Sequence, residues 1–126
     1  NFTHLEKLNW FFINLIKNFL NIKKKIIFSS ELNLKKKNLK KDSYLLEICK
    51  NLSADTFISA EGSRGYLQES RIFERSNVKV NYFSMKNFVY NQLYGNFISN
   101  LSTIDIIFNE GTATQSILRK NFLLNE

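Results

Sequence analysis

The fold is decided by one stretch in the middle of the chain, Thr56-Phe57-Ile58-Ser59-Ala60-Glu61-Gly62-Ser63-Arg64-Gly65-Tyr66-Leu67. Its first residues, Thr56 to Ser59, combine β-branched and aromatic side chains and are typical of a short strand. Two of the chain's four glycines follow, and a helix is expected from Tyr66-Leu67 to Arg75. A strand that runs through a glycine-containing loop into a helix begins a βαβ unit, so this stretch predicts a sheet of mostly parallel strands.

The residues before this stretch predict two helices and another strand. Apolar side chains recur at helical spacing from about residue 4 to residue 20, and Thr3 with Glu6 forms a capping-box pattern before them. The β-branched run Ile26-Ile27-Phe28 predicts a strand that is covered on both faces. Asp42 or Ser43 can cap a second helix that ends near Ser53.

The residues after it continue the same alternation. Val78 to Phe83 alternate between apolar and polar side chains, as a half-buried strand does. Ser102 and Asp105 form a second capping-box pattern, which opens a helix that should stop at Gly111, and a last helix is expected over residues 114–123. We therefore expect residues 1–126 to form a single α/β domain, a three-layer Rossmann-like sheet of mostly parallel strands with flanking helices.

Composition excludes several classes of protein. The single cysteine, Cys49, cannot form an internal disulfide, and with only one histidine a thiolate–imidazole zinc site is not expected. The longest apolar run is too short to span a membrane, and no signal peptide precedes the domain, so a cytoplasmic protein is expected. Nothing in the residues points to a particular cofactor.

The chain carries a formal net charge of +7, and the excess lies in its first half. Residues 1–50 contain 11 lysines and 4 acidic residues. The lysines cluster at 23–25, 35–37 and 40–41. No aromatic residue is interleaved with them to stack on bases, so a nucleic acid is not the expected partner.

Parallel sheets bind ligands beyond the carboxyl ends of their strands. This rule selects the loop of residues 59–66, which we call the glycine loop. It offers hydroxyls, glycines and a guanidinium for phosphate or carboxylate at the start of a helix. The expected substrate-binding residues here are Ser59, Gly62, Ser63, Arg64 and Tyr66. The alternative is a tight connection whose glycines only permit positive φ, and the loop matches neither the Walker pattern nor Gly-x-Gly-x-x-Gly.

A second candidate group lies between residues 87 and 105. Tyr90, Gln92 and Ser102 can orient a polar ligand through hydrogen bonds. Asp105 is the expected catalytic carboxylate, and Glu31, after the strand expected at 26–28, could form an acid–base pair with it. The alternative is that Ser102 and Asp105 only cap their helix.

Five blocks of sequence occur in an order that resembles the WbqC-like protein family. They are residues 26–32, residues 46–59, Gly62-Ser63-Arg64-Gly65-Tyr66-Leu67, Tyr90-Asn91-Gln92-Leu93-Tyr94-Gly95-Asn96-Phe97-Ile98 and residues 100–109. The resemblance implies a bacterial protein of O-antigen or other surface-polysaccharide biosynthesis. It implies a transferase that attaches an acyl, aminoacyl or related group to a nucleotide-activated sugar, with a nucleotide sugar or acyl donor and other polysaccharide-biosynthesis enzymes as partners.

The chain departs from the family pattern in three places. Asn87-Phe88-Val89 stands where the family tends to have His-Pro before the Tyr-x-Gln, and Ser99 stands where it tends to have proline. The family's upstream His-x-x-Tyr-x-Pro-like segment is not in this sequence, which suggests the carboxyl-terminal portion of a longer protein.

The sequence is therefore compatible with three functions. The first is an enzyme that modifies a nucleotide sugar. The second is a basic nucleic-acid-binding module that uses the lysine clusters, and the third is a non-catalytic interaction domain of a polysaccharide assembly complex.

Overall fold

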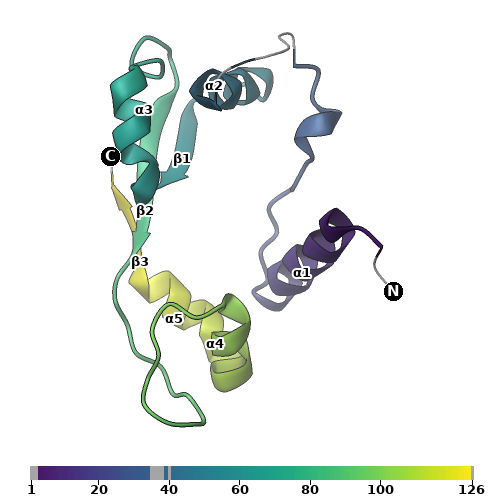
Figure 1. Cartoon of the computed structure of the whole chain (residues 1–126), viewed down its shortest axis with the longest axis vertical. Helices are drawn as coiled ribbons and strands as arrows, with labels where there is room; N and C mark the ends of the chain where they lie inside the picture. Colours follow the sequence, from purple (N-terminus) through teal and green to yellow (C-terminus); the bar gives the residue numbers. More distant parts are fainter. Residues whose placement is uncertain (1–2, 35–38, 40, 126) are drawn as a thin grey trace. The chain divides into compact units, whose positions relative to one another are not determined.

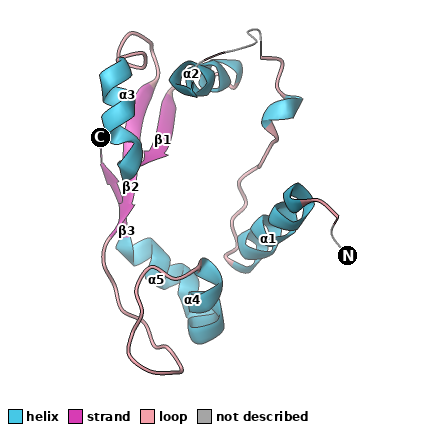
Figure 2. Cartoon of the chain, in the orientation of Figure 1, coloured by secondary structure: helices cyan, strands magenta, loops and turns pink. Residues whose placement is uncertain are grey.

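A computed structural model describes residues 3–34, 39 and 41–125 of the chain. The chain divides into two compact units (Figure 1). One unit comprises Asn1–Lys25 with Asn87–Asn121, and the other comprises Ile26–Lys86 with Phe122–Glu126. We call them the helical unit and the sheet unit, after the elements that each contains (Figure 2). Each is described by itself.

The sheet has three strands in the order β1-β2-β3, with β1 at Thr56–Ala60, β2 at Lys79–Met85 and β3 at Phe122–Asn125. β1 pairs parallel with β2, with Thr56 opposite Lys79. β3 pairs antiparallel with β2, with Asn125 opposite Tyr82. The α/β class is confirmed, but the sheet is mixed, so the prediction of mostly parallel strands is wrong. The three-layer Rossmann-like arrangement is not confirmed.

Two segments account for this difference. Phe122 and Leu123, expected as the end of the last helix, belong to β3, where Phe122 stacks on Phe83 with ring centroids 5.8 Å apart. The expected strand at Ile26–Phe28 does not form. The amide of Glu31 donates to the carbonyl of Phe28 at 3.0 Å, which begins the short 3-10 helix η1 (Ser29–Glu31). The chain turns into η1 directly after these three residues, and among the described residues no strand pairs with them.

Two helices pack against the sheet around one core. α2 spans Lys41–Asn51, and α3 spans Arg64–Ser70 after the 3-10 turn η2 at Glu61–Ser63. α3 ends earlier than the expected Arg75, because Arg71 takes the left-handed conformation at φ 52°. The predicted β1–helix–β2 crossover is present. The buried core consists of Leu46, Cys49, Leu67, Phe73, Val78 and Tyr82.

The helical unit contains α1 (Leu5–Phe19), α4 (Thr103–Glu110), the 3-10 turn η3 (Gly111–Ala113) and α5 (Thr114–Asn121). Gly111 ends α4 at φ +53°, as predicted. The fully buried Thr114 donates its hydroxyl to the carbonyl of Ile106 at 3.2 Å. The side-chain amide of Gln115 donates to the carbonyl of Leu20, which ties α5 to the end of α1.

The start of α1 differs from the sequence prediction. Its predicted Thr3–Glu6 capping box is absent, because His4 is the N-cap residue and the Thr3 hydroxyl instead bonds the His4 ring at 2.9 Å. No side chain of the apolar stripe along α1 is fully buried. Part of the stripe lines an apolar groove of about 240 Å³ with α4. Among the described residues, no helix has the length and apolarity needed to cross a membrane.

Candidate functional site

The serine hydroxyls of the glycine loop form hydrogen bonds within the loop. The side chains of Ser59 and Ser63 lie 2.7 Å apart, and Ser63 donates to the carbonyl of Ala60 at 2.6 Å. These bonds hold the turn between β1 and α3. A ligand that used either hydroxyl would therefore replace a bond within the loop.

Arg64 is paired with an acidic residue that the sequence analysis did not select. Its guanidinium donates twice to Glu61, at 2.5 Å and 3.2 Å, and lies 4.0 Å from the centroid of the Tyr82 ring. The hydrogen bond from Arg64 lowers the pKa of Glu61, and the same bond raises the pKa of Arg64. An anionic ligand would have to compete with Glu61 for this guanidinium. The signal for the pair was its i, i+3 spacing.

The backbone conformation of this loop does not require glycine at positions 62 and 65. Positive φ among glycines occurs at Gly95 and Gly111, not at Gly62 or Gly65, so the alternative that these two glycines permit positive φ is wrong for this structure. A Cβ added at Gly62 or Gly65 would meet no atom within 4 Å. Both positions therefore leave open space beside the backbone.

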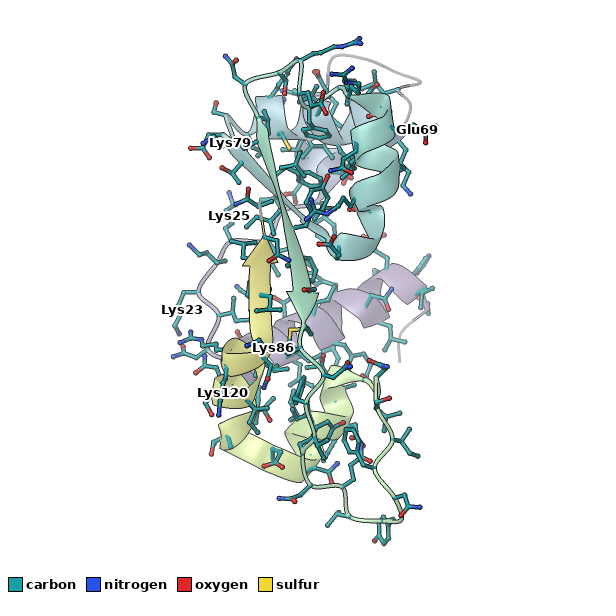
Figure 3. All side chains as sticks on the ribbon, turned by 90° about the vertical axis from the view of Figure 1, so that its left-hand side faces the viewer. Lys23, Lys25, Glu69, Lys79, Lys86 and Lys120 are labelled. Carbon is teal, nitrogen blue, oxygen red and sulfur yellow. The ribbon has the colours of Figure 1, made fainter. Side chains whose placement is uncertain are left out.

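One member of the glycine loop lines a groove in the sheet unit. The groove has a volume of about 680 Å³ and is lined by Arg64 and Gln68 of α3 and by residues from Phe73 to Tyr82. Lys79 lies at the start of β2, beside the groove, and Lys86 follows the other end of that strand (Figure 3). Tyr66 has a different neighbour, since the ammonium of Lys41 lies 4.5 Å from the centroid of its ring.

The helical unit brings three of the predicted site residues together. The hydroxyl of Tyr90 donates to Asp105 Oδ2 at 2.6 Å. The side-chain nitrogen of Gln92 lies 3.2 Å from the same carboxylate oxygen and 3.2 Å from the Tyr90 hydroxyl. All three side chains are half-buried. We call this group the Tyr90–Asp105 cluster.

The carboxylate controls the protonation of the phenol. The hydrogen bond to Asp105 raises the pKa of Tyr90, with desolvation as the second cause. A phenol with its ordinary pKa is already protonated at neutral pH, and the raised pKa extends the range over which Tyr90 is a hydrogen-bond donor. The carboxylate of Asp105 bonds Tyr90 and Gln92, so the predicted capping box is only half formed. Ser102 does cap α4, since its hydroxyl accepts from the amide of Ile104 at 3.3 Å.

Residues that the sequence analysis missed hold this cluster in place. The amide of Asn91 donates to Glu110 at 2.8 Å, and the amide of Leu93 donates to Asn109 at 3.2 Å. Gln92 bonds both backbone groups of Ile98, donating to its carbonyl at 3.0 Å and accepting from its amide at 2.9 Å. An irregular segment is thus fixed along α4 by side chains. The only sequence signal was that Asn109 and Glu110 lie about one turn after Asp105.

Aromatic rings surround the phenol. The ring of Phe97 meets the ring of Tyr90 edge-on at 5.3 Å, and the ring of Phe88 lies 6.0 Å from it. An apolar ring face beside a carboxylate and an amide is a combination that suits a ligand with both apolar and hydroxylated faces.

The remaining predicted residue, Glu31, lies in the sheet unit and Asp105 in the helical unit. Glu31 is exposed, and its carboxylate accepts from the amide of Phe28 at 3.4 Å. Its pairing with Asp105 stays a prediction. In the described part of the chain, no three His, Cys, Asp or Glu side chains form a group that could hold a metal ion.

Comparison with known proteins gives this chain a family. It is 29% identical over 118 residues to the uncharacterised protein Rv1507c of Mycobacterium tuberculosis. The match covers 93% of this chain and 49% of the relative, so the chain spans about half the length of the curated relative that it matches. No solved structure matches the chain. Residues 1–117 match the WbqC-like protein family, and the chain therefore belongs to that family.

Proposed function

We propose that this chain is the carboxyl-terminal part of a cytoplasmic enzyme that modifies a nucleotide-activated sugar in the synthesis of O-antigen or another bacterial surface polysaccharide. The reaction proposed is transfer of an acyl, aminoacyl or related group. Other enzymes of polysaccharide biosynthesis are its proposed partners. The observation that carries the proposal is the Tyr90–Asp105 cluster with its aromatic neighbours.

The cluster supports a sugar ligand because of the types of group that it combines. A sugar ring presents hydroxyls at its edge and C–H groups on its faces. A carboxylate accepts hydrogen bonds from hydroxyls, and the faces of Phe88, Tyr90 and Phe97 are apolar surfaces for the C–H groups. The hydrogen bonds that Asn109 and Glu110 accept from backbone amides hold the segment before any ligand arrives, which lowers the entropic cost of binding.

The other predicted residues take roles in this proposal by their chemistry. Asp105 is the proposed general base of the helical unit. Ser102 is proposed to contact the sugar from the N-cap of α4. Within the sheet unit, Arg64 is proposed to bind a phosphate group, with Ser59, Gly62, Ser63 and Tyr66 beside it. In that role Arg64 exchanges or shares its bonds to Glu61.

Calorimetric titration of the chain with nucleotide-activated hexoses tests the proposal. We expect saturable binding that survives moderate salt, and a loss of about tenfold or more in affinity for Asp105→Asn, the scale of one charge-assisted hydrogen bond. Glu69→Gln is the matched control, because it makes the same change at an exposed carboxylate of α3 and should bind like the unaltered chain. Absence of binding to the unaltered chain would overturn the proposal, as would equal affinity in Asp105→Asn.

A further inference from the structure

The hydrogen-bond donors of the Tyr90–Asp105 cluster are already in use. Tyr90 has one O–H, and it donates to Asp105. The side-chain nitrogen of Gln92 has two hydrogens and three acceptors within 3.2 Å: Tyr90, Asp105 and the carbonyl of Ile98. The Gln92 oxygen accepts from the amide of Ile98. The cluster therefore has no spare donor to offer a ligand.

The cluster can still accept a hydrogen bond from a ligand. Both bonds to the Asp105 side chain reach Oδ2. Within the described residues no hydrogen bond reaches the other oxygen, Oδ1, whose lone pairs remain available. A ligand group that meets Asp105 must therefore donate, which selects hydroxyls and amines and excludes phosphates and carboxylates.

Charge favours an amine over a hydroxyl as the ligand group that donates to Asp105. The ion pairs found among the described residues are Arg64–Glu61 and Arg71–Glu74, so within that part of the chain no cation neutralises Asp105. A protonated amine brings a positive charge and three donors to this carboxylate.

We infer that the Tyr90–Asp105 cluster recognises the free, protonated amino group of an amino sugar through Asp105 Oδ1. The inference rests on the proposed function and names its substrate class: a nucleotide-activated amino sugar rather than its N-acylated or hydroxylated counterpart. Acylation of the nitrogen removes the charge and two of its three hydrogens, so the product no longer matches the site.

The test is a titration with three ligands that differ in one substituent: UDP-glucosamine, UDP-N-acetylglucosamine and UDP-glucose. We expect the amine to bind about tenfold or more tightly than the other two, the scale of one charge-assisted hydrogen bond. This preference should disappear in Asp105→Asn and persist in the Glu69→Gln control. In the unaltered chain it should also weaken as the pH rises through the pKa of the ligand's amine, which gives a readout that needs no variant.

The outcomes separate this inference from the proposed function. Equal binding of all three ligands would overturn the inference and leave the proposed function standing. A preference for the amine that persists in Asp105→Asn, or that does not change with pH, would also overturn it. Failure of every nucleotide sugar to bind would overturn the proposed function itself.

Discussion

The phenol of Tyr90 and the carboxylate of Asp105 act as one unit in this structure. The 2.6 Å bond between them fixes the direction in which the phenol donates and leaves one carboxylate oxygen open. The phenol is a donor across the physiological range, and its raised pKa extends that range to higher pH. In the proposed reaction Tyr90 is therefore a positioning residue, and the carboxylate is the group that meets the ligand.

Removing this hydroxyl should destabilise the chain. Tyr90→Phe leaves Asp105 Oδ2 with Gln92 alone, and we expect the free energy of unfolding to fall by about 1.5 to 3 kcal/mol, the usual range for a hydrogen bond to a charged group. Urea denaturation followed by circular dichroism measures it. Tyr94→Phe is the matched control, because Tyr94 is 89% exposed and should tolerate the change. Equal effects of the two variants would contradict this account of the cluster.

The pair of Glu61 and Arg64 should stabilise the chain at neutral pH and lose its effect in acid. The pKa of Glu61 in the folded chain lies below its ordinary value of 4.5, so near that pH the unfolded chain binds more protons than the folded chain. The stabilisation is present above the ordinary value and disappears as the pH falls through the lowered value. Thermal melts should show a difference in Tm between the unaltered chain and Glu61→Gln at neutral pH that shrinks below about pH 4. A difference that stays constant from neutral to acidic pH would exclude the pair as its source.

At the scale of the helices, two glycines should respond in opposite directions to alanine. Gly65 lies inside α3 with open space beside it, so Gly65→Ala should stabilise the chain by about 0.5 to 1 kcal/mol through helix propensity. Gly111 ends α4 at φ +53°, which L-residues rarely adopt, so Gly111→Ala should cost about 1 to 2 kcal/mol. Chemical denaturation of the two variants checks this. Destabilisation by Gly65→Ala would mean that the first turn of α3 is not formed as described.

Elements with local signals were predictable from the sequence, and elements that depend on distant partners were not. The Ser102 cap and Gly111 marked both ends of α4, and the strand–loop–helix pattern at residues 56–67 marked β1 and α3. β3 carries no such signal, because Phe122 and Leu123 continue the apolar pattern of α5 and become a strand only by pairing with β2. Conversely, Ile26–Phe28 has the composition of a strand but no partner edge among the described residues.

The same distinction applies to the candidate site. Tyr90, Gln92 and Asp105 were selected for their functional groups, and the structure brings them within hydrogen-bond distance of one another. Asn109 and Glu110 were not selected, since their role is to bind backbone amides of a segment far away in sequence. Such bonds depend on where the irregular segment lies, which no local pattern specifies.

At the scale of the whole molecule, the positive charge is shared between the two units. The helical unit carries seven basic and three acidic side chains, and the sheet unit carries eleven basic and eight acidic. Lys23, Lys24 and Lys25 are exposed, whereas Lys35, Lys36, Lys37 and Lys40 lie outside the described residues. The basic excess is therefore general, which favours non-specific attraction over a built nucleic-acid site.

Binding to duplex DNA should accordingly be weak and strongly dependent on salt. Each lysine–phosphate contact releases a counterion, so we expect affinity to fall by about a factor of 10³ or more between 50 mM and 200 mM salt if several lysines take part. Fluorescence anisotropy with a short labelled duplex measures this, with a nucleotide sugar in parallel. Tight DNA binding at 50 mM salt that falls steeply as salt is added, with no binding of the nucleotide sugar, would favour the nucleic-acid-binding module over the enzyme.

The side chain of Gln92 closes a surface loop by bonding the backbone of Ile98. The side-chain amide of Gln92 bonds both the carbonyl and the amide of Ile98, as the backbone of a paired strand would. These two bonds join the ends of the segment that runs from residue 93 to residue 97. Leu93 and Tyr94 within that segment are 78% and 89% exposed. Replacing residues 94–96 would leave this closure, the Phe97 ring against Tyr90 and the carboxylate of Asp105 in place, so the exposed tip of the loop can change in sequence without loss of the cluster.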